Sequence, residues 1–557
     1  MVSWHTQLLS ELGKQWGTAC VVGRRHHSRA SNCVQSSLLF GFHRRSAFIA
    51  ALVATTTFAS AIHCRELRPG VDASYYTPRH NASGHMVATP SGMIASLWRL
   101  TLCAAPGALS GRLIIERRAG CPPDLVAYPG ADTPLRNHVG PDDFLVELAG
   151  PELSVLSQAP SPRNCSYSFP FNVSVPGQYH LRVLHLYEKF AAVDERITGW
   201  APIHLDDILG GGTTVNFGGT DAAFATRLHA VLIAGKGLTR CSSHEAMGSG
   251  RWLVAESPTT ALHAGPVPVT DEAIGDAARG WPIARYVNIS SYRWVPTTCA
   301  RKPLVRETLS SCLARRHVLV IGDSQMRVWF NGLVRQLQGG SGRLAVKGLS
   351  QTCVPGALSL CYHYDPFARK AIKTINALVQ RVRSRASLLV IINVGHHAAS
   401  NEHWRVERYY KAVYDLLHHA VVSLAGNNAL LLWVAAQATP PGWSPSRVRH
   451  KDWRTPPRLR AFAVSGQRAF NTLTAALNVS NARSAARHVT GSMWQRHRQR
   501  RQTARVLLQY VDAYTPSVAV ANTARDGSHI TQVDFQALLR EMVFLAAGCR
   551  VRHSTHS

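Results

Sequence analysis

The segment His317-Val-Leu-Val-Ile-Gly-Asp-Ser-Gln-Met-Arg327 joins a short apolar run to a polar turn and the start of an amphipathic stretch. This pattern predicts a buried parallel strand that delivers Ser324 to a tight turn at the N-terminus of a helix. The free N–H groups of such a helix end stabilise negative charge that develops on a substrate oxygen. The segment therefore predicts a nucleophilic serine at the edge of an α/β sheet.

A candidate base lies near the C-terminus. The sequence Arg525-Asp-Gly-Ser-His529 comes just before a helix-like run at 531–547. The carboxylate of Asp526 would orient the imidazole of His529, and this imidazole would take the proton of Ser324. An Asp and a His at this spacing can equally cap a helix. Because the serine is followed by the Asp–His pair in the order that this chemistry uses, we expect a catalytic triad of Ser324, Asp526 and His529.

A third polar element follows a second apolar run, 388–393. The run ends in Asn393-Val-Gly395-His396-His397, at the strand edge where ligands bind in open α/β sheets. Asn393 would donate its side-chain amide to an oxyanion, and Gly395 would let a substrate approach the backbone closely. A strand-end Asn can equally just end a strand.

These motifs resemble those of the SGNH or GDSL hydrolases. They are most similar to the PC-esterase families, which comprise the plant trichome-birefringence-like polysaccharide O-acetyltransferases and the animal neurexophilin-and-PC-esterase domain proteins. The resemblance covers about residues 241–549 and is carried by Gly322-Asp323-Ser324, Arg327, Asn393-Val-Gly395-His396, Asp526 to His529, Cys241 to Trp252, Tyr292 to Cys299, and Cys312-Leu313. The chain departs from the plant pattern at His397-Ala398, where two aromatic residues are usual, and at Gly527, where a Cys is usual.

The resemblance implies a glycan O-acetyltransferase that works through an acyl-serine intermediate on cell-wall or other polysaccharides. A glycan O-acetyl esterase of the same fold and a non-catalytic glycan-binding glycoprotein are the alternatives. The residues expected to contact substrate or an oxyanion are Asn393, Gly395, Asp323, Arg327 and His396. We expect no bound cofactor and no metal site, and the sequence does not indicate the acyl donor.

The N-terminal region predicts membrane targeting. His43-Arg44-Arg45 precedes an uncharged apolar run, 46–62, which would span about 25 Å as a helix. The upstream basic residues predict a cytosolic tail, 1–45, and a single-pass type II signal-anchor in the Golgi membrane, with the catalytic domain in the lumen. A cleavable signal peptide ending near Ala59-Ser60-Ala61, and hence secretion, is the alternative.

The remainder divides into three expected parts: a stem (63–85), a β domain (86–235) and a catalytic domain (236–557). In the β domain, alternating runs such as 143–148 and 178–184 predict an immunoglobulin- or filamin-like β-sandwich. The glycine-rich segment 210–219 is expected to be a loop. The catalytic part predicts an SGNH-type α/β/α sandwich, with strands at 317–322, 388–393, 429–436 and 506–511 and helices at 325–337, 405–424 and 458–477.

Several features are typical of a disulfide-bonded secretory glycoprotein. Sequons occur after the apolar run, at Asn81, Asn164, Asn172, Asn288 and Asn478. Most of the 12 cysteines also follow that run. The pairs expected from proximity in the sequence are Cys103–Cys121 and Cys353–Cys361, and Cys312–Cys549 is expected to join the ends of the catalytic domain. The spacing alone does not fix these pairings.

The formal net charge of +29 indicates a polyanionic partner. No zinc-finger spacing or other nucleic-acid module is present in the sequence, so nucleic acid is not expected. The partners expected are a polysaccharide or glycan acceptor, for which an acidic glycan is one candidate, and the membrane through the N-terminal anchor. Arg supplies most of the basic residues, and this skew can also reflect codon usage.

Overall fold

The structure, a computed structural model, is a mixed α/β protein with several sheets. It describes residues 62–67, 76–80, 86–90, 97–120, 142–159, 165–188, 203–209, 213–218, 222–235, 237–255, 291–314, 316–339, 352–354, 359–382, 387–401, 404–440, 454–489, 506–524, 528–530 and 532–549.

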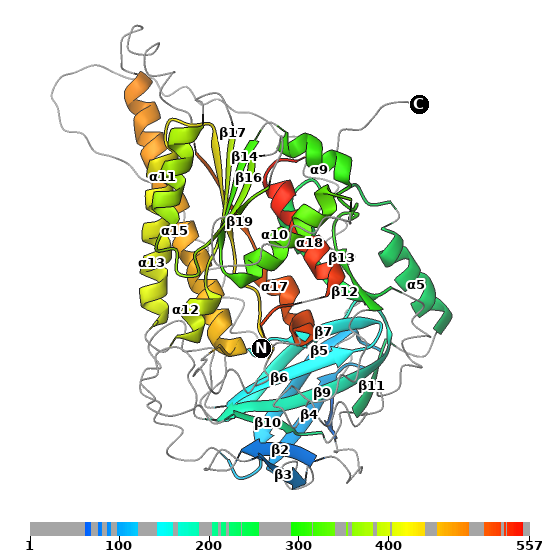
Figure 1. Cartoon of the computed structure of the whole chain (residues 1–557). Coiled ribbons are helices and arrows are strands. Elements are labelled where there is room, and N and C mark those ends of the chain that lie inside the picture. Colours follow the sequence, from blue (N-terminus) through cyan, green and yellow to red (C-terminus); the bar gives the residue numbers. More distant parts are fainter. Residues whose placement is uncertain are drawn as a thin grey trace, which may run out of the picture. The chain divides into compact units, whose positions relative to one another are not determined.

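A largely parallel sheet forms the centre of the C-terminal half (Figure 1). Its strands lie in the order β15-β16-β14-β17-β18-β19, and only the two-residue β15 is antiparallel to its neighbour. The bounds are β14 Arg316–Gly322, β15 Thr352–Cys353, β16 Ser359–Tyr364, β17 Ser387–Asn393, β18 Ala429–Val434 and β19 Leu507–Val511. All four strands expected from the sequence are confirmed, and β15 and β16 are additional ones.

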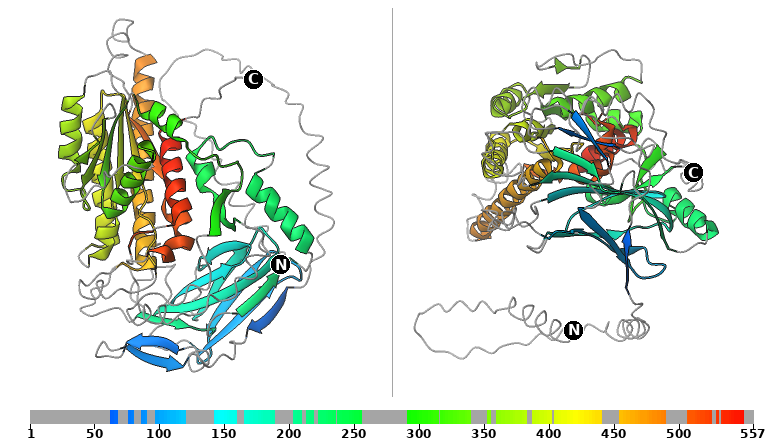
Figure 2. Two further views of the ribbon diagram at one scale, coloured as in Figure 1. Left: turned by 45° about the vertical axis from the view of Figure 1, so that its right-hand side comes forward. Right: turned by 90° about the horizontal axis from the view of Figure 1, so that it is seen from below.

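Helices cover both faces of this sheet, as Figures 1 and 2 show. Alternate residues of β14 enter two different cores: Val318 and Val320 pack with α10 and α18, and Leu319 and Ile321 pack on the opposite side. The helices are α9 Arg306–Leu313, α10 Ser324–Leu337 and α18 Val533–Ala546 on the first side, and α11 Ala371–Arg381, α13 Val406–Leu424 and α15 Pro456–Val489 on the second. Shorter ones are α6 His244–Gly248, α12 His396–Ser400, α17 Tyr514–Ser517 and the 3₁₀ helix η3 Val518–Thr523.

The N-terminal half contains two antiparallel sheets that share one core. One has the strand order β1-β4-β5-β8, and the other has the order β10-β9-β6-β7-β12-β13 with β11 paired to β9. Leu100 and Phe169 of the first sheet pack with Val146 and Val183 of the second. The strands are β1 His63–Leu67, β4 Trp98–Ala104, β5 Ser110–Arg117, β6 Asp142–Ala149, β7 Glu152–Leu156, β8 Ser166–Asn172, β9 Gly177–Glu188, β10 Ile203–Asp207, β11 Thr213–Phe217, β12 Gly250–Val254 and β13 Tyr292–Pro296, with β2 Tyr76–His80 and β3 Met86–Pro90 as a separate pair and α5 Ala222–Ala234 after β11.

Two strands from the expected catalytic part belong to this second sheet. Trp252 of β12 lies opposite Leu153 of β7 and opposite Trp294 of β13. The indole N–H of Trp252 donates to the carbonyl of Pro516 at 2.9 Å, and the backbone N–H of Trp294 donates to Asp534 of α18 at 2.8 Å. The expected boundary at 235/236 therefore does not separate the sheet from the catalytic part.

Three sequence expectations concern the N-terminal half: the stem, the glycine-rich loop and the membrane anchor. The expected stem, 63–85, contains β1, which pairs with β4 along its whole length, so the sheet begins by His63. The expected loop at 210–219 contains β11, because Thr213-Thr-Val-Asn-Phe217 has the alternation of a strand and pairs with β9. The expected anchor, apart from Ile62, lies outside the described residues. Among the described helices, none is long and apolar enough to cross a bilayer.

Four disulfides join described cysteines. Cys353–Cys361 and Cys312–Cys549 confirm the expected pairs. The expected pair Cys103–Cys121 is wrong, since Cys103 bonds Cys64 across the β1–β4 ladder. Cys241–Cys299 is the fourth pair, and Cys165 is also disulfide-bonded.

The loop lengths predict unequal contributions of two disulfides to stability. Cys312–Cys549 closes a separation of 237 residues, and Cys353–Cys361 closes one of 8. Chain entropy predicts losses of about 5 and about 2.5 kcal/mol, respectively, when each pair is replaced by alanines. Urea unfolding of Cys312→Ala/Cys549→Ala beside Cys353→Ala/Cys361→Ala checks this. Equal losses would contradict the entropic account.

Candidate active site

Ser324 lies at a switch point of the parallel sheet. It is the first residue of α10 and follows the carboxyl end of β14. The next parallel strand along the chain, β16, lies on one side of β14, and β17 lies on the other. The helices that follow β14 and β16, α10 and α11, lie on opposite faces of the sheet, and open α/β sheets bind ligands at such a switch point. Ser324 is half-buried at this edge.

Buried contacts fix the turn before Ser324. Asp323 caps α10, because its carboxylate accepts the N–H of Gln325 at 2.9 Å. The hydroxyl of Tyr362 donates to the carbonyl oxygens of Asp323 at 2.8 Å and of Gly322 at 3.2 Å. A Cβ on Gly322 would come within 2.6 Å of the carbonyl oxygen of Asn393, so only glycine fits between the two strand ends.

These contacts indicate a structural role for Asp323. It was expected to contact substrate, but its side chain is 0% exposed. Burial raises the pKa of Asp323 above its usual range. Electrostatic interactions with His397, Arg454 and His529 and the hydrogen bond from the N–H of Gln325 oppose this rise. Asp323 therefore shapes the turn and does not face a ligand.

A hydrogen bond brings the His529 segment to the start of α10. The side-chain amide of Gln325 donates to the carbonyl oxygen of Ser528. His529 is half-buried, and it acts electrostatically on both Asp323 and His396. Among the described residues no hydrogen bond joins Ser324 to His529. Asp526, the expected third member of the triad, lies outside the described residues.

The end of β17 is built differently from the expectation. The side-chain amide of Asn393 donates to the carbonyls of Val434 and Ala435 at 3.0 and 2.9 Å, and the residue is 0% exposed. Both amide hydrogens are thus used to hold β17 against the end of β18, and an oxyanion role for Asn393 is not supported. Gly395 has a φ of 153°, and a Cβ there would lie 2.9 Å from that of Ala436.

The two histidines after Gly395 have different environments. His396 is 1% exposed, so the expected contact with substrate is not supported for it. Burial, followed by electrostatic interactions with Arg454, His397 and His529, lowers the pKa of His396 well below its ordinary value of 6.5, and a hydrogen bond with the backbone of Gln437 opposes this shift. His397 is half-buried, and its Nε2 lies 3.4 Å from the hydroxyl of Tyr364. His397 is therefore the histidine at the rim.

An aromatic row extends from this rim. The ring centroids of Tyr364 and His397 are 6.3 Å apart, those of His397 and Phe367 are 5.9 Å apart, and Phe367 stacks on Trp404 at 5.9 Å. Three arginines lie over the row: Arg327 over Tyr364, Arg369 over Phe367 and Arg408 over Trp404. Arg327, expected from its place after Ser324, is thus half-buried at the edge of the site.

Sequence reasoning missed this row. Tyr362 and Tyr364 belong to β16, whose alternating sequence Ser359-Leu-Cys-Tyr-His-Tyr364 is a strand signal that was available. Phe367 and Trp404 lie in connecting segments, where no periodicity marks their neighbours in space. Each ring packs against the next, and the rings of Tyr364, Phe367 and Trp404 also pack against an arginine.

Several buried polar atoms near this edge have no hydrogen-bond partner among the described residues. They include one carboxylate oxygen of Asp323, the side-chain carbonyl oxygens of Gln325 and Asn393, and the side-chain amide of Gln437. Native proteins rarely leave such groups unsatisfied. These atoms lie at or just after the carboxyl ends of β14, β17 and β18.

Two expected glycosylation sites lie among the described residues. Asn172, at the end of β8, and Asn478, on α15, are exposed. The other three, Asn81, Asn164 and Asn288, lie outside the described residues. Within the described part of the chain, no group of three or more His, Cys, Asp or Glu could hold a metal ion.

No family model matches the chain, and no curated protein matches it.

His396 makes the folding stability depend on pH. The unfolded chain protonates this histidine near pH 6.5, whereas the folded protein keeps it neutral well below that pH. The unfolded state therefore binds more protons as the pH falls below about 6.5, and stability is lost at up to about 1.4 kcal/mol per pH unit. Replacing His396 by Gln removes this contribution.

Urea unfolding between pH 7.5 and pH 5 measures the effect. We expect the slope of stability against pH to be shallower in His396→Gln than in the wild type. His418→Gln, an exposed position on α13, is the matched control and leaves the slope unchanged. Parallel slopes for wild type and His396→Gln would show that His396 is not held neutral.

Proposed function

We propose that the chain is a glycan O-acetyltransferase that uses Ser324 as nucleophile and His529 as base. The observation that carries the proposal is the hydrogen bond from Gln325 to Ser528, because it brings the segment of the expected base to the first turn of the nucleophile's helix. The placement of Ser324 at the switch point of the parallel sheet supports it independently. The resemblance of the motifs to the PC-esterase families suggests the reaction and an SGNH-type fold.

In the first half of the reaction, His529 accepts the proton of the Ser324 hydroxyl while Oγ forms a bond to the acyl carbonyl carbon. The N–H groups in the first turn of α10, including that of Ser324, stabilise the oxyanion. The leaving group takes the proton from His529, and an acyl-serine remains. The gap between Ser324 and His529 closes when substrate binds, as is common for catalytic hydrogen bonds that are long in unliganded enzymes.

In the second half, His529 deprotonates an acceptor hydroxyl, which attacks the acyl-serine; the bond between the acyl carbon and Ser324 Oγ breaks, and Oγ takes the proton from His529. A sugar hydroxyl gives an O-acetyl glycan, and water gives acetate. The aromatic row with its arginines provides a wall for an acceptor beside Ser324, and this wall favours transfer over hydrolysis because it can exclude water. The four disulfides favour an oxidising compartment such as the Golgi lumen.

Replacing Ser324 by Ala tests the proposal directly. Full-length protein is incubated with p-nitrophenyl acetate and xylan or pectin oligosaccharides, and the product masses are followed. We expect an added acetyl group on the oligosaccharide, and a rate at least about 10³-fold lower for Ser324→Ala and for His529→Asn, since removal of a nucleophile or its base has effects of this order.

Acetate release without an acetylated oligosaccharide would identify an esterase instead. Equal rates for the wild type and a folded Ser324→Ala variant would exclude the covalent mechanism. The variant's unfolding midpoint and circular dichroism spectrum establish that it is folded.

Gln325 is a positioning residue in this scheme. Gln325→Leu removes the donor to Ser528 and leaves the Asp323 cap, which uses the backbone N–H of the same residue. We expect kcat to fall about tenfold, the loss that follows from one hydrogen bond of about 1.4 kcal/mol, with KM for the acceptor unchanged. Gln380→Leu, at an exposed position on α11, is the matched control.

A purely structural role of Gln325 would lower stability and leave the pH profile of kcat intact. Loss of positioning instead shifts the apparent pKa of the base in that profile, because His529 moves relative to Ser324. An unchanged kcat in Gln325→Leu would show that the Gln325–Ser528 contact does not hold the base.

A further inference from the structure

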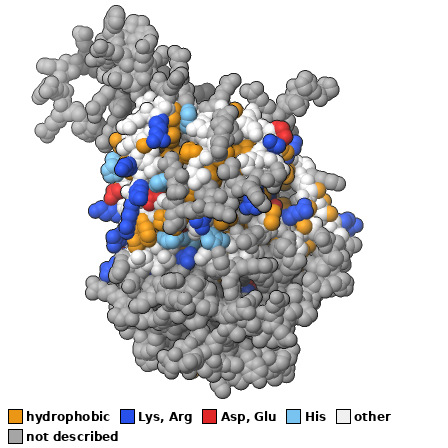
Figure 3. Space-filling model, viewed as in Figure 1, with side chains coloured by type: hydrophobic (Ala, Val, Ile, Leu, Met, Phe, Trp, Pro, Cys, Tyr) orange, Lys and Arg blue, Asp and Glu red, His pale blue; other side chains and the backbone are white. Residues whose placement is uncertain are grey.

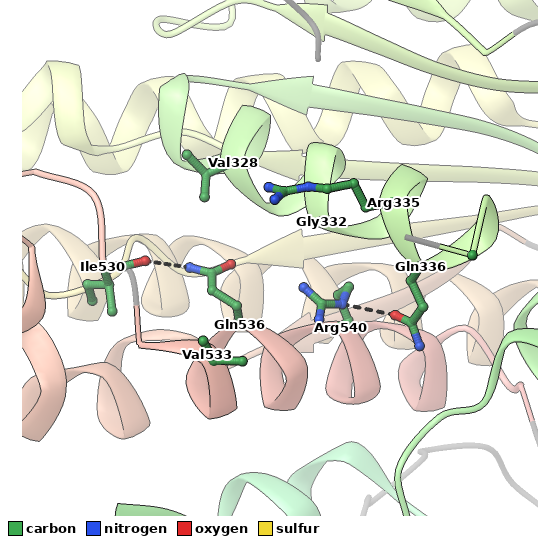
Figure 4. Close-up of a pocket in the computed structure, with 9 residues that line it drawn as sticks. Val328, Gly332, Arg335, Gln336, Ile530, Val533, Gln536 and Arg540 are labelled. Atoms are coloured by element: carbon green, nitrogen blue, oxygen red, sulfur yellow. Dashed lines mark hydrogen bonds between the residues drawn. The ribbon is translucent and has the colours of Figure 1, made fainter. Parts of the chain in front are cut away.

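A groove runs between α10 and α18 (Figure 4). Its volume is about 630 Å³, within the range of ligand-binding pockets. Val328 and Ile530 lie at one end of the view, and Arg335, Gln336 and Arg540 lie toward the other. The side chain of Arg540 is held toward α10, since its Nε donates to the side-chain oxygen of Gln336 at 3.1 Å.

The far end of the groove is positively charged. Arg335 and Arg540 line it, and Arg306 reaches Gly339, which lines the same end. Within the described part of the chain, no carboxylate forms an ion pair with any of the three. Arg540 is half-buried, and burial together with the charges of Arg335 and Arg301 lowers its pKa, which Glu541 partly opposes.

Glu541 does not neutralise this end, because it pairs with Arg301 at 2.6 Å. Guanidinium groups without a carboxylate partner, here the half-buried Arg540 and the exposed Arg335 and Arg306, attract carboxylate or phosphate oxygens, which they bind in pairs of hydrogen bonds. Lys and Arg side chains elsewhere are spread over the described part of the face shown in Figure 3, so what distinguishes the groove is its concave shape.

The other end of the groove begins near the proposed nucleophile. Val328 lies four residues after Ser324, so the two share one face of α10, with a separation of about 6 Å along the helix axis. Gly332 and Arg335 continue the same stripe, which places Arg335 about 16 Å from Ser324 along the axis. Ile530 follows the proposed base His529 directly. An extended ligand that reacts at Ser324 can therefore continue along the groove.

We propose that the groove between α10 and α18 binds the uronate carboxylates of an acidic glycan acceptor. This inference rests on the proposed function, since it names the acceptor class of that site. A glycan chain passing Ser324 meets Arg335 and Arg540 on this side and Arg327 at the aromatic row. A polymer with regularly spaced carboxylates fits charges placed at such separations.

Direct binding tests this without turnover. Full-length protein carrying Ser324→Ala is titrated calorimetrically with an oligogalacturonide, with the fully methyl-esterified oligogalacturonide of the same length, and with pyrophosphate. The added variants are Arg335→Gln, Arg335→Gln/Arg540→Gln, and the matched control Arg381→Gln. Arg335 is exposed, so the single variant tests the charge even if the double variant fails to fold, and Arg381 is exposed on α11, away from the groove.

We expect the oligogalacturonide to bind more tightly than its ester, about tenfold more weakly in the double variant, and several-fold more weakly in Arg335→Gln. Arg381→Gln leaves binding unchanged. Equal binding of the acid and its ester, or no effect of Arg335→Gln, would overturn the proposal. Pyrophosphate binding that depends on Arg335, without oligogalacturonide binding, would also overturn it in favour of a phosphate-bearing ligand.

The outcome is separable from that of the proposed function. Arginine-dependent binding of the acid by a protein that transfers no acetyl group would leave a glycan-binding groove without the chemistry. Acetyl transfer at equal rates to acceptors with and without free carboxylates would support the acetyltransferase activity. It would also show that this groove is not the acceptor site.

Discussion

The fixed position of α18 is the constraint on which the site depends. The segment that follows the helix is joined to the end of α9 by Cys312–Cys549, and Arg301 pairs with Asp534 in its first turn and with Glu541 in its middle, each at 2.6 Å. Burial alone would lower the pKa of Arg301, but these two carboxylates raise it on balance, so the guanidinium and its partners form one charged, buried unit. His529 lies just before α18, and its distance from Ser324 is therefore set by contacts far from the chemistry.

The cluster of Arg301, Asp534 and Glu541 also connects the two halves of the chain. Asp534 accepts the backbone N–H of Trp294, and the strand that carries Trp294 pairs with β12, which in turn pairs with β7 of the N-terminal sheet. The segments around Trp252 and Trp294 resemble motifs of an esterase family, yet their indoles donate to backbone carbonyls in the interior. Their physical role is to connect sheet and helix, so their effect on the candidate site passes through the position of α18.

Much of the parallel sheet could be predicted from the sequence, because its strands are continuous apolar runs and its helices carry clear periodicity. Less of the site could be predicted. Asp323, Asn393 and His396 are polar residues at strand ends, where local sequence does not distinguish a side chain that faces a ligand from one that holds a turn. Tyr364, His397, Phe367 and Trp404 meet only in the folded chain, and the Gln325–Ser528 contact spans 203 residues. Contacts between residues so far apart in the sequence are determined by the topology of the fold, which local sequence patterns do not reveal.

The residues within each motif have different roles, and most of these roles are structural. In Gly322-Asp323-Ser324, the glycine admits the end of β17, the aspartate caps α10, and only the serine is left half-exposed. In Asn393-Val-Gly395-His396, the asparagine holds β18 and the histidine is buried neutral. Motifs of this kind specify how a serine is presented at a sheet edge. Under the proposed function, the acceptor is selected by surfaces outside these motifs, and the two candidates are the aromatic row with its arginines and the basic groove along α10.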